Sequence, residues 1–234
     1  MSLIFALLRE DHIVFGADSR HVIGTVDARY LNDKSCKVER IQDGRGLFGF
    51  AGNDICEAIV STVKQKRIHE ELSLQLAVRE VSEIACEIYT KRFPGDSGYA
   101  TGNGVELLLA GFEGSAAKSY MMTSPGFGQL PRTYESGYDT FEIIGKRRHG
   151  ALYAFRKCAN SATSIESGLR LAYFTLLEVS QYDTAVGGEP QVYILRRDSL
   201  VDDQTEKLKA YKEWAADIGG RIAQLVTDPT SADR

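Results

Sequence analysis

The fold of this chain is decided by its first pair of apolar segments, SLIFALLREDHIVFGADSR (residues 2–20). Ser2–Leu8 and Ile13–Ala17 are almost entirely apolar, and four polar residues between them, 9–12, form a short break. Two apolar runs around a polar turn predict a β-hairpin. Neither strand carries the polar alternation of a solvent-facing strand, so we expect both to be covered on both faces.

The hairpin begins next to the start of the sequence, with no leader expected because residues 1–8 are too short for a signal-peptide core. Chain termini are usually disordered unless something holds them. A terminal segment in a buried strand is therefore unusual and suggests a functional role for the terminus. We predict that this terminus carries the functional group of the protein. Removal of Met1 would give Ser2 a hydroxyl and a free α-amine, which together form a nucleophile and a base.

Composition bounds the class of protein. The 234 residues are 43% hydrophobic and 26% charged, with a net charge of −4, which is typical of an ordinary globular domain. This charge provides no attraction for nucleic acid or an anionic membrane. No apolar window approaches the ~18 residues of a membrane span. We therefore expect a cytoplasmic protein with neither nucleic acid nor membrane as a partner.

The spacing of the cysteines and glycines matches no motif that binds a metal or a nucleotide cofactor. The four cysteines are widely spaced, without a CxxC pair or a histidine at metal-ligand spacing, which favours reduced thiols and no metal. The sequence also lacks GxxxxGK[ST] and GxGxxG phosphate-binding loops. We expect no cofactor.

Further segments alternate between strand and helix patterns. Residues 20–32 are polar and indicate a loop, and the Asp43-Gly44 step predicts a hairpin turn. A long irregular stretch is expected over 124–139. The expected strands are Ser35–Ile41, Leu47–Ala51, Val105–Phe112, Ser119–Thr123, Phe141–Ile144 and Gln191–Arg196.

Apolar stripes predict helices over Asp54–Glu71, Ser73–Phe93, Ser164–Gln181 and Gln204–Val226. Asn53 and Ser73 are suitable N-cap residues for the first two helices. Apolar strand pairs with helices in separate blocks predict an α+β fold: a four-layer αββα sandwich of two stacked antiparallel sheets flanked by helices. We expect one domain over residues 1–200, a C-terminal helix within 201–226 and a disordered tail over 227–234.

Four blocks of sequence carry a resemblance to a known family. They are Val14–Arg20, Cys36–Ile41, Phe50–Gly52 and Tyr182–Gly188. In this order and spacing the chain resembles the β-type subunits of the proteasome family, including the bacterial ring proteases and their relatives. The family is one of N-terminal nucleophile hydrolases with an αββα sandwich, which cleave peptide bonds inside rings of subunits.

The resemblance implies roles for particular residues. Ser2 takes the place of the nucleophilic threonine, Asp18 and Lys37 match the acid and the lysine beside it, and Gly52 matches the oxyanion glycine. Asp183 matches the supporting aspartate. Residues implied to line the substrate pocket are His21, Ser35 and Phe50. The implied partners are identical subunits in one ring or stacked rings, unfolded protein or peptide substrates, and a separate ATPase unfoldase.

The chemistry is consistent with these residue types. An α-amine with a pKa of ~7.7–8.0 is partly neutral at pH 7 and can take the hydroxyl proton. A nearby Lys37 ammonium would lower the pKa of the amine and of the hydroxyl, and Asp18 would orient it. The Gly52 amide would stabilise the oxyanion, a contribution of ~3–4 kcal/mol per donor.

The chain also departs from the family's pattern. Serine replaces threonine, Lys146 stands at a serine position, Val186 replaces a small hydroxyl residue, and Phe50 lies where the pocket has its floor. Lys34 competes with Lys37, and Asp18 could instead belong to a strand-end turn. The alternative function is a catalytically silent, ring-forming homologue that acts as a scaffold or binding module. A third is an amidase or peptide ligase that uses the same site.

Overall fold

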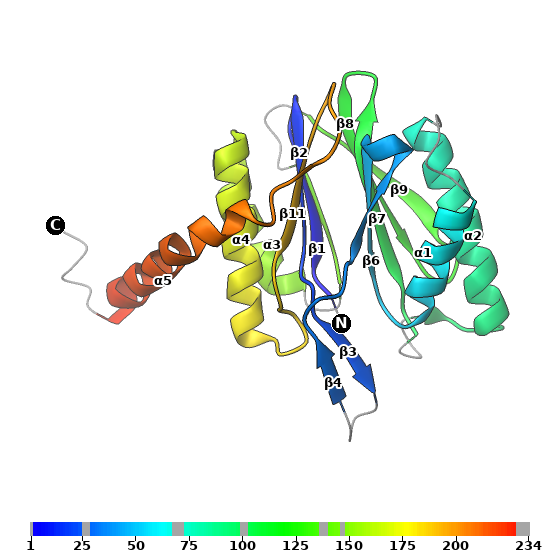
Figure 1. Cartoon of the computed structure of the whole chain (residues 1–234), viewed down its shortest axis with the longest axis horizontal. Helices are drawn as coiled ribbons and strands as arrows, with labels where there is room; N and C mark the ends of the chain where they lie inside the picture. Colours follow the sequence, from blue (N-terminus) through cyan, green and yellow to red (C-terminus); the bar gives the residue numbers. More distant parts are fainter. Residues whose placement is uncertain are drawn as a thin grey trace.

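The computed structural model describes residues 2–24, 29–66, 73–98, 103–135, 140–145 and 148–227. Two five-stranded antiparallel sheets face each other. Figure 1 shows helices α1 and α2 on the outer face of one sheet and α3 and α4 on the outer face of the other. The predicted α+β, four-layer αββα sandwich is confirmed.

The first sheet contains the hairpin that opens the sequence. Its strand order is β10-β1-β2-β11-β12, with all pairs antiparallel. The strands are β1 (Ile4–Leu8), β2 (His12–Ala17), β10 (Phe141–Ile144), β11 (Gln191–Arg196) and β12 (Asp202–Asp203). The hairpin strands β1 and β2 therefore lie in the interior of the sheet, where both of their edges are paired.

The two faces of β1 and β2 are both buried, as their composition predicts. Ile4 and Phe15 belong to the core between the sheets, whereas Phe5 and Val14 belong to the core under the helices. Successive residues of a strand point to opposite faces, so a strand between two cores must be apolar throughout. Gly16 permits this packing, because a Cβ there would overlap the Phe5 ring.

The second sheet has the order β5-β6-β7-β8-β9. Its strands are β5 (Val38–Ile41), β6 (Gly46–Ala51), β7 (Glu106–Glu113), β8 (Ala116–Thr123) and β9 (Gly128–Thr133). The predicted turn at Asp43-Gly44 is the short 3-10 turn η1 (Gln42–Gly44), in which Gly44 has φ +84°.

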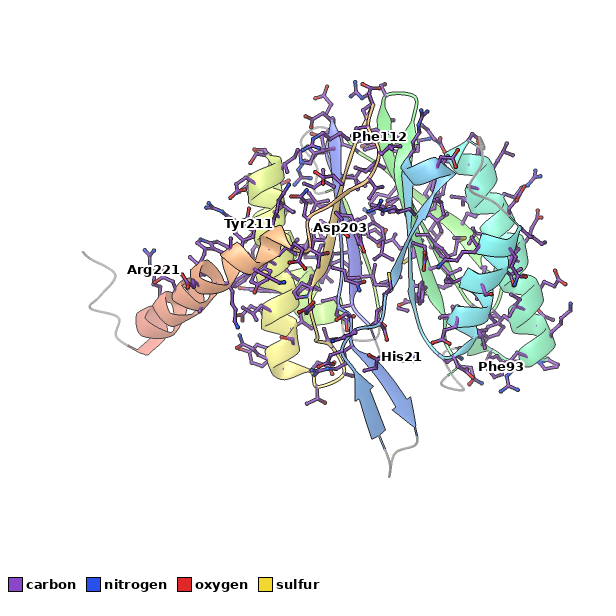
Figure 2. The ribbon with its side chains drawn as sticks, in the orientation of Figure 1. His21, Phe93, Phe112, Asp203, Tyr211 and Arg221 are labelled. Atoms are coloured by element: carbon purple, nitrogen blue, oxygen red, sulfur yellow. The ribbon has the colours of Figure 1, made fainter. Side chains whose placement is uncertain are left out.

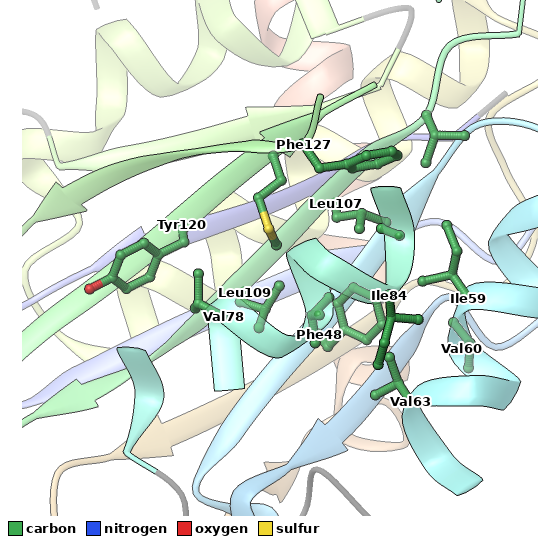
Figure 3. Packing of buried hydrophobic residues seen from close by; sticks show 14 of the residues in the cluster. Phe48, Ile59, Val60, Val63, Val78, Ile84, Leu107, Leu109, Tyr120 and Phe127 are labelled. Carbon is green, nitrogen blue, oxygen red and sulfur yellow. The ribbon is translucent and has the colours of Figure 1, made fainter. Parts of the chain in front are cut away.

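Helices α1 (Ile55–Gln65) and α2 (Leu74–Arg92) cover the second sheet. Ser73 caps α2 as predicted, because its side chain accepts from the Leu76 amide. The N-cap of α1 is Asp54 and not the predicted Asn53; the Asn53 side-chain oxygen instead accepts from the Ile55 amide at 3.2 Å, one residue before the cap position. Figure 3 shows how α1, α2 and the sheet enclose one apolar core. This core includes Phe48, Ile59, Val60, Val63, Val78, Ile84, Leu107, Leu109, Tyr120 and Phe127.

The first sheet is covered by α3 (Arg148–Cys158) and α4 (Ile165–Tyr182). Ser164 begins α4 with a capping box completed by Ser167. The short turn η3 (Ala159–Ser161) joins the two helices. A turn, η4 (Lys207–Ala210), then precedes α5 (Tyr211–Thr227), which packs on α4 at its start and leads away from the sheets (Figure 1).

Further local predictions need correction. The expected loop over 20–32 contains a two-stranded hairpin, β3 (His21–Gly24) and β4 (Arg29–Asn32), and α3 was not expected. The expected irregular stretch contains β9; its Pro131 is tolerated because β9 is an edge strand, paired only with β8. The last helix begins at Tyr211 instead of Gln204, after η4.

Within the described residues, every helix is too short or too polar to cross a membrane.

Candidate functional site

The centre of the candidate site is the carboxylate of Asp18, which follows directly after β2 and is 2% exposed. Oδ1 accepts from the Leu3 amide at 2.8 Å. Oδ2 accepts from the Gly187 amide at 3.2 Å and from the Arg20 amide at 3.3 Å. These bonds tie the start of β1 and the turn before β11 to one buried anion.

Lys37 provides the opposite charge. Its side chain comes from the segment just before β5, is buried, and donates from Nζ to Asp18 Oδ2 at 2.8 Å. Nζ also donates to the backbone carbonyl of Arg20. The described residues thus use two of the three donors of this ammonium.

Burial sets the protonation behaviour of this ion pair. It raises the pKa of the Asp18 carboxyl, against the opposing effects of Lys37 and of the Leu3 and Gly187 amides. It lowers the pKa of the Lys37 ammonium, against the attraction of Asp18. A lysine with a lowered pKa exchanges protons more readily near neutral pH than a solvated one does.

Two further side chains hold Lys37 and its neighbours in place. The Gln191 amide group bridges the segment, because its Oε1 accepts from the Lys37 amide at 3.1 Å and its Nε2 donates to the Ser35 carbonyl at 3.0 Å. Arg20 makes a two-point pair with Asp33, at 2.6 and 2.9 Å. Neither Gln191 nor Arg20 was predicted as a site residue; a Gln at the start of a strand carries no signal of such a role.

A small cleft lies beside the ion pair and encloses about 70 Å³. Ser2 lines it and is 8% exposed. The structure thus brings Ser2 and Lys37 into one cleft, with Asp18 buried behind Lys37. Its other lining residues are His21, Ser35, Cys36, Phe50, Gly52, Asn53, Cys56 and Glu57.

All three predicted substrate-binding residues are in this set. His21 lies at the base of the β3–β4 hairpin (Figure 2), Ser35 lies two residues before Lys37, and Phe50 lies on β6. Phe50 packs against the core under α1 and α2, so its ring forms a fixed wall of the cleft. Cys36, Cys56 and Glu57 were not predicted, because the patterns around them indicate only a strand and a helix.

Gly52 is placed where only glycine fits. Its φ is +152°, and a Cβ there would lie 2.7 Å from the carbonyl oxygen of Gly104. Gly52 is exposed at the cleft and follows directly after β6. Ser2 and Gly52 line the same cleft, and the predicted role of the Gly52 amide at an oxyanion remains a prediction.

Asp183 has a different position from the other predicted catalytic residues. It is the C-cap of α4, and its Oδ1 accepts from the Ala185 amide at 2.9 Å. Its segment reaches the ion pair through the Gly187 amide, which bonds to Asp18. Val186, between them, is fully buried in the core under α3 and α4. The predicted catalytic role of Asp183 remains a prediction.

Gly145 supports Ser2 from the other side. It has φ +117°, and a Cβ there would overlap the Ser2 carbonyl oxygen. Its amide donates to the buried carboxylate of Glu106 on β7. The end of β10 therefore lies against the Ser2 backbone and is itself hydrogen-bonded to the second sheet. Lys146, which we singled out in the sequence, lies outside the described residues.

The two cleft cysteines should differ sharply in reactivity. Cys36 is exposed, whereas burial, followed by the nearby Asp54 carboxylate, raises the pKa of Cys56 to about 12. Because only the thiolate reacts with alkylating agents, iodoacetamide at pH 8 should modify Cys36 within minutes and leave Cys56 unmodified until the protein unfolds. Peptide mapping by mass spectrometry checks this. Equal modification of the two in the folded protein would contradict the burial of Cys56.

Within the described residues, no group of three or more His, Cys, Asp and Glu side chains is arranged to hold a metal ion.

Comparison with solved structures identifies the fold. Anbu, described as an ancestral beta-subunit, from Yersinia bercovieri superimposes with a TM-score of 0.77 over 97% of both chains at 16% identity. The chain has the fold of Anbu. A Gly-1 mutant of Anbu from Hyphomicrobium sp. strain MC1 gives a TM-score of 0.75 over 97% of both chains, again at 16% identity.

Anbu from Pseudomonas aeruginosa, described as a helical assembly of the Anbu complex, matches with a TM-score of 0.71 and 19% identity. The match covers 95% of this chain and 96% of that Anbu chain. No protein-family model and no curated protein sequence matches the chain. The likeness to Anbu is therefore a likeness of fold, and the fold expected from the resemblance to proteasome β-type subunits is confirmed.

Proposed function

We propose that this protein is an N-terminal serine hydrolase of peptide or amide bonds. One observation supports it above the others: Ser2 and Lys37 line the same cleft, with Asp18 buried in contact with Lys37 and Gly52 on the cleft wall. These groups come from four separate segments. Hydrogen bonds hold Asp18 and Lys37 in place, and Gly52 has a backbone conformation that crowds any Cβ.

The arrangement supplies the parts of an acyl-transfer reaction. After removal of Met1, the α-amine of Ser2 takes the proton of the Ser2 hydroxyl as the oxygen attacks the substrate carbonyl, and returns it to the leaving amine. Water then hydrolyses the acyl-enzyme by the reverse sequence. Lys37, held by Asp18, supplies positive charge beside the nucleophile. The Gly52 amide would donate to the oxyanion.

Self-association is the second part of the proposal. The Pseudomonas aeruginosa Anbu, which shares this fold, is described as a helical assembly. Head-to-tail contacts between identical subunits produce a closed ring if the rotation closes and a helix if it does not. We propose that copies of this chain associate in this way and enclose their clefts, with unfolded peptides as substrates.

The decisive experiment combines intact mass with peptide hydrolysis. Protein purified without an N-terminal tag should lack Met1 and hydrolyse fluorogenic peptide amides. Ser2→Ala should reduce the rate at least about a thousandfold, since it removes the nucleophile. Ser115→Ala is the matched control, because Ser115 is exposed in the turn between β7 and β8; it should leave the rate unchanged.

Two results would overturn the hydrolase. One is uniform retention of Met1, which converts the Ser2 amine to an amide. The other is hydrolysis that Ser2→Ala does not reduce. A protein that lacks Met1, assembles, and hydrolyses none of the peptides would instead support the alternative function, a catalytically silent homologue that acts as a scaffold or binding module.

A further inference from the structure

The exposed charge in the cleft is anionic. Glu57, in the first turn of α1, lines the cleft and its side chain is 72% exposed. The Nδ1 atom of the His21 imidazole lies 3.7 Å from Glu57 Oε1, too long for a hydrogen bond. By contrast, Lys37 is buried and paired with Asp18. Glu57 therefore has its hydrogen-bonding capacity open to a ligand.

The negative field extends into the cleft. Asp54, the N-cap residue of α1, is exposed three residues before Glu57. The two carboxylates add to the effect of burial in raising the pKa of the Cys56 thiol, which lines the cleft. A buried group on the cleft wall thus senses both carboxylates. A cation at the mouth would experience the same field with favourable sign.

The size of the cleft restricts how a side chain can bind. A volume of about 70 Å³ is far below the ~300–1,000 Å³ of pockets that enclose a drug-sized ligand. A long side chain must therefore lie along the cleft and leave its end at the mouth. Lysine and arginine suit this arrangement, because their aliphatic stems pack on apolar surface while the charged ends stay at the rim. The Phe50 ring is such a surface.

We propose that the cleft selects peptides with a lysine or arginine beside the scissile carbonyl, with the stem on Phe50 and the cation at Glu57. This inference rests on the proposed function, because the attack by Ser2 defines which substrate residue enters the cleft. Glu57 is then a specificity residue: it contacts the substrate side chain and takes no part in bond cleavage.

The test separates binding from turnover. Two fluorescent peptides differ only in arginine or citrulline at the residue before the scissile bond; citrulline is nearly isosteric with arginine and uncharged. Their affinities are measured by fluorescence anisotropy on the Ser2→Ala variant, which cannot turn them over, and their hydrolysis is measured on the wild-type protein. Arginine should bind about threefold to fivefold more tightly, since exposed ion pairs contribute modestly.

Glu57→Gln should abolish this preference. The matched control is Glu83→Gln on α2, which removes the same charge from a glutamate of similar exposure, 69% against 72%, outside the cleft. It should leave the preference intact. Equal affinity for both peptides, no binding of either, or a preference that survives Glu57→Gln would each overturn the proposal. If both peptides are hydrolysed without a preference, the proposed hydrolase function stands and the proposed cation site fails. If arginine binds preferentially but neither peptide is hydrolysed, the cation site stands and the hydrolase function fails.

Discussion

Asp18→Asn is expected to lower the free energy of unfolding by about 3–5 kcal/mol, because it leaves the buried Lys37 ammonium without its counter-charge. Asparagine has nearly the same shape, so the loss cannot come from a cavity. Two further hydrogen bonds are lost when the side-chain nitrogen of the asparagine replaces Oδ2, because that nitrogen cannot accept from the Gly187 and Arg20 amides. Urea unfolding followed by circular dichroism measures the difference.

The double variant Asp18→Asn/Lys37→Met is the internal control. It removes both charges, so it should be more stable than Asp18→Asn by about 1–3 kcal/mol, although it contains one more substitution. A double variant no more stable than Asp18→Asn would show that the two groups are not coupled and would contradict the buried ion pair.

The free energy of unfolding of the single variant Asp18→Asn should also depend on pH in a defined direction. Burial already lowers the pKa of Lys37 in the folded protein, and loss of Asp18 lowers it further. The unfolded chain, with a lysine pKa of ~10.4, then binds more protons than the folded one between the two pKa values. The stability of Asp18→Asn should therefore rise with pH below about 10.

Gly145→Ala is expected to lower the free energy of unfolding by about 3 kcal/mol or more, since two costs combine. Its φ of +117° is unfavourable for a residue with a Cβ, and that Cβ would overlap the Ser2 carbonyl oxygen. The backbone at Ser2 must shift to relieve the overlap. Peptide hydrolysis should fall by more than the loss of folded protein explains, because Ser2 is the proposed nucleophile.

Gly95→Ala separates these two costs. Gly95 also has a positive φ, +73°, but a Cβ there meets nothing within 4 Å. It should cost only the conformational term of about 1–2 kcal/mol and leave hydrolysis unchanged. If the two variants are equally stable, the close approach of Gly145 to Ser2 is wrong.

The regular elements could largely be predicted from local patterns. Ser73 forms the expected cap of α2, because capping depends on neighbouring residues alone. Ser164, the first residue of another predicted helix, caps α4 although no cap was predicted there, and the predicted cap at Asn53 is displaced by Asp54. The elements that were missed have weaker patterns. Among the residues of α3 whose burial is described (151–158), Ala151 and Phe155 are fully buried, and basic residues lie at both ends of the helix. In β9 the sequence contains Pro131, which is compatible with a strand only because β9 lies at the edge of its sheet.

The site residues also fall into a group that could be predicted from the sequence and a group that could not. Ser2, Lys37, Gly52, His21, Ser35 and Phe50 were each singled out from the chain, and the structure gathers all of them at one cleft. The partners that hold and complete the site could not be found. Gly187 acts through a backbone amide, which every residue but proline has, and Gln191 stands at the start of β11, where the sequence pattern indicates only a strand.

The order of residues was enough to establish the buried hairpin and the layer type, because apolar residues at successive positions demand cover on both faces of a strand. It also placed a hydroxyl beside the terminus and an Asp at the end of the second strand. The family resemblance predicted that Lys37 lies near Asp18, but only the tertiary structure decided the geometry of that contact and the other approaches within the site. The contact of Asp18 with Lys37, the support of Ser2 by Gly145 and the exposure of Glu57 at the cleft join residues from different sheets and helices. Such distances depend on how the layers pack, and local sequence carries no record of packing between distant segments.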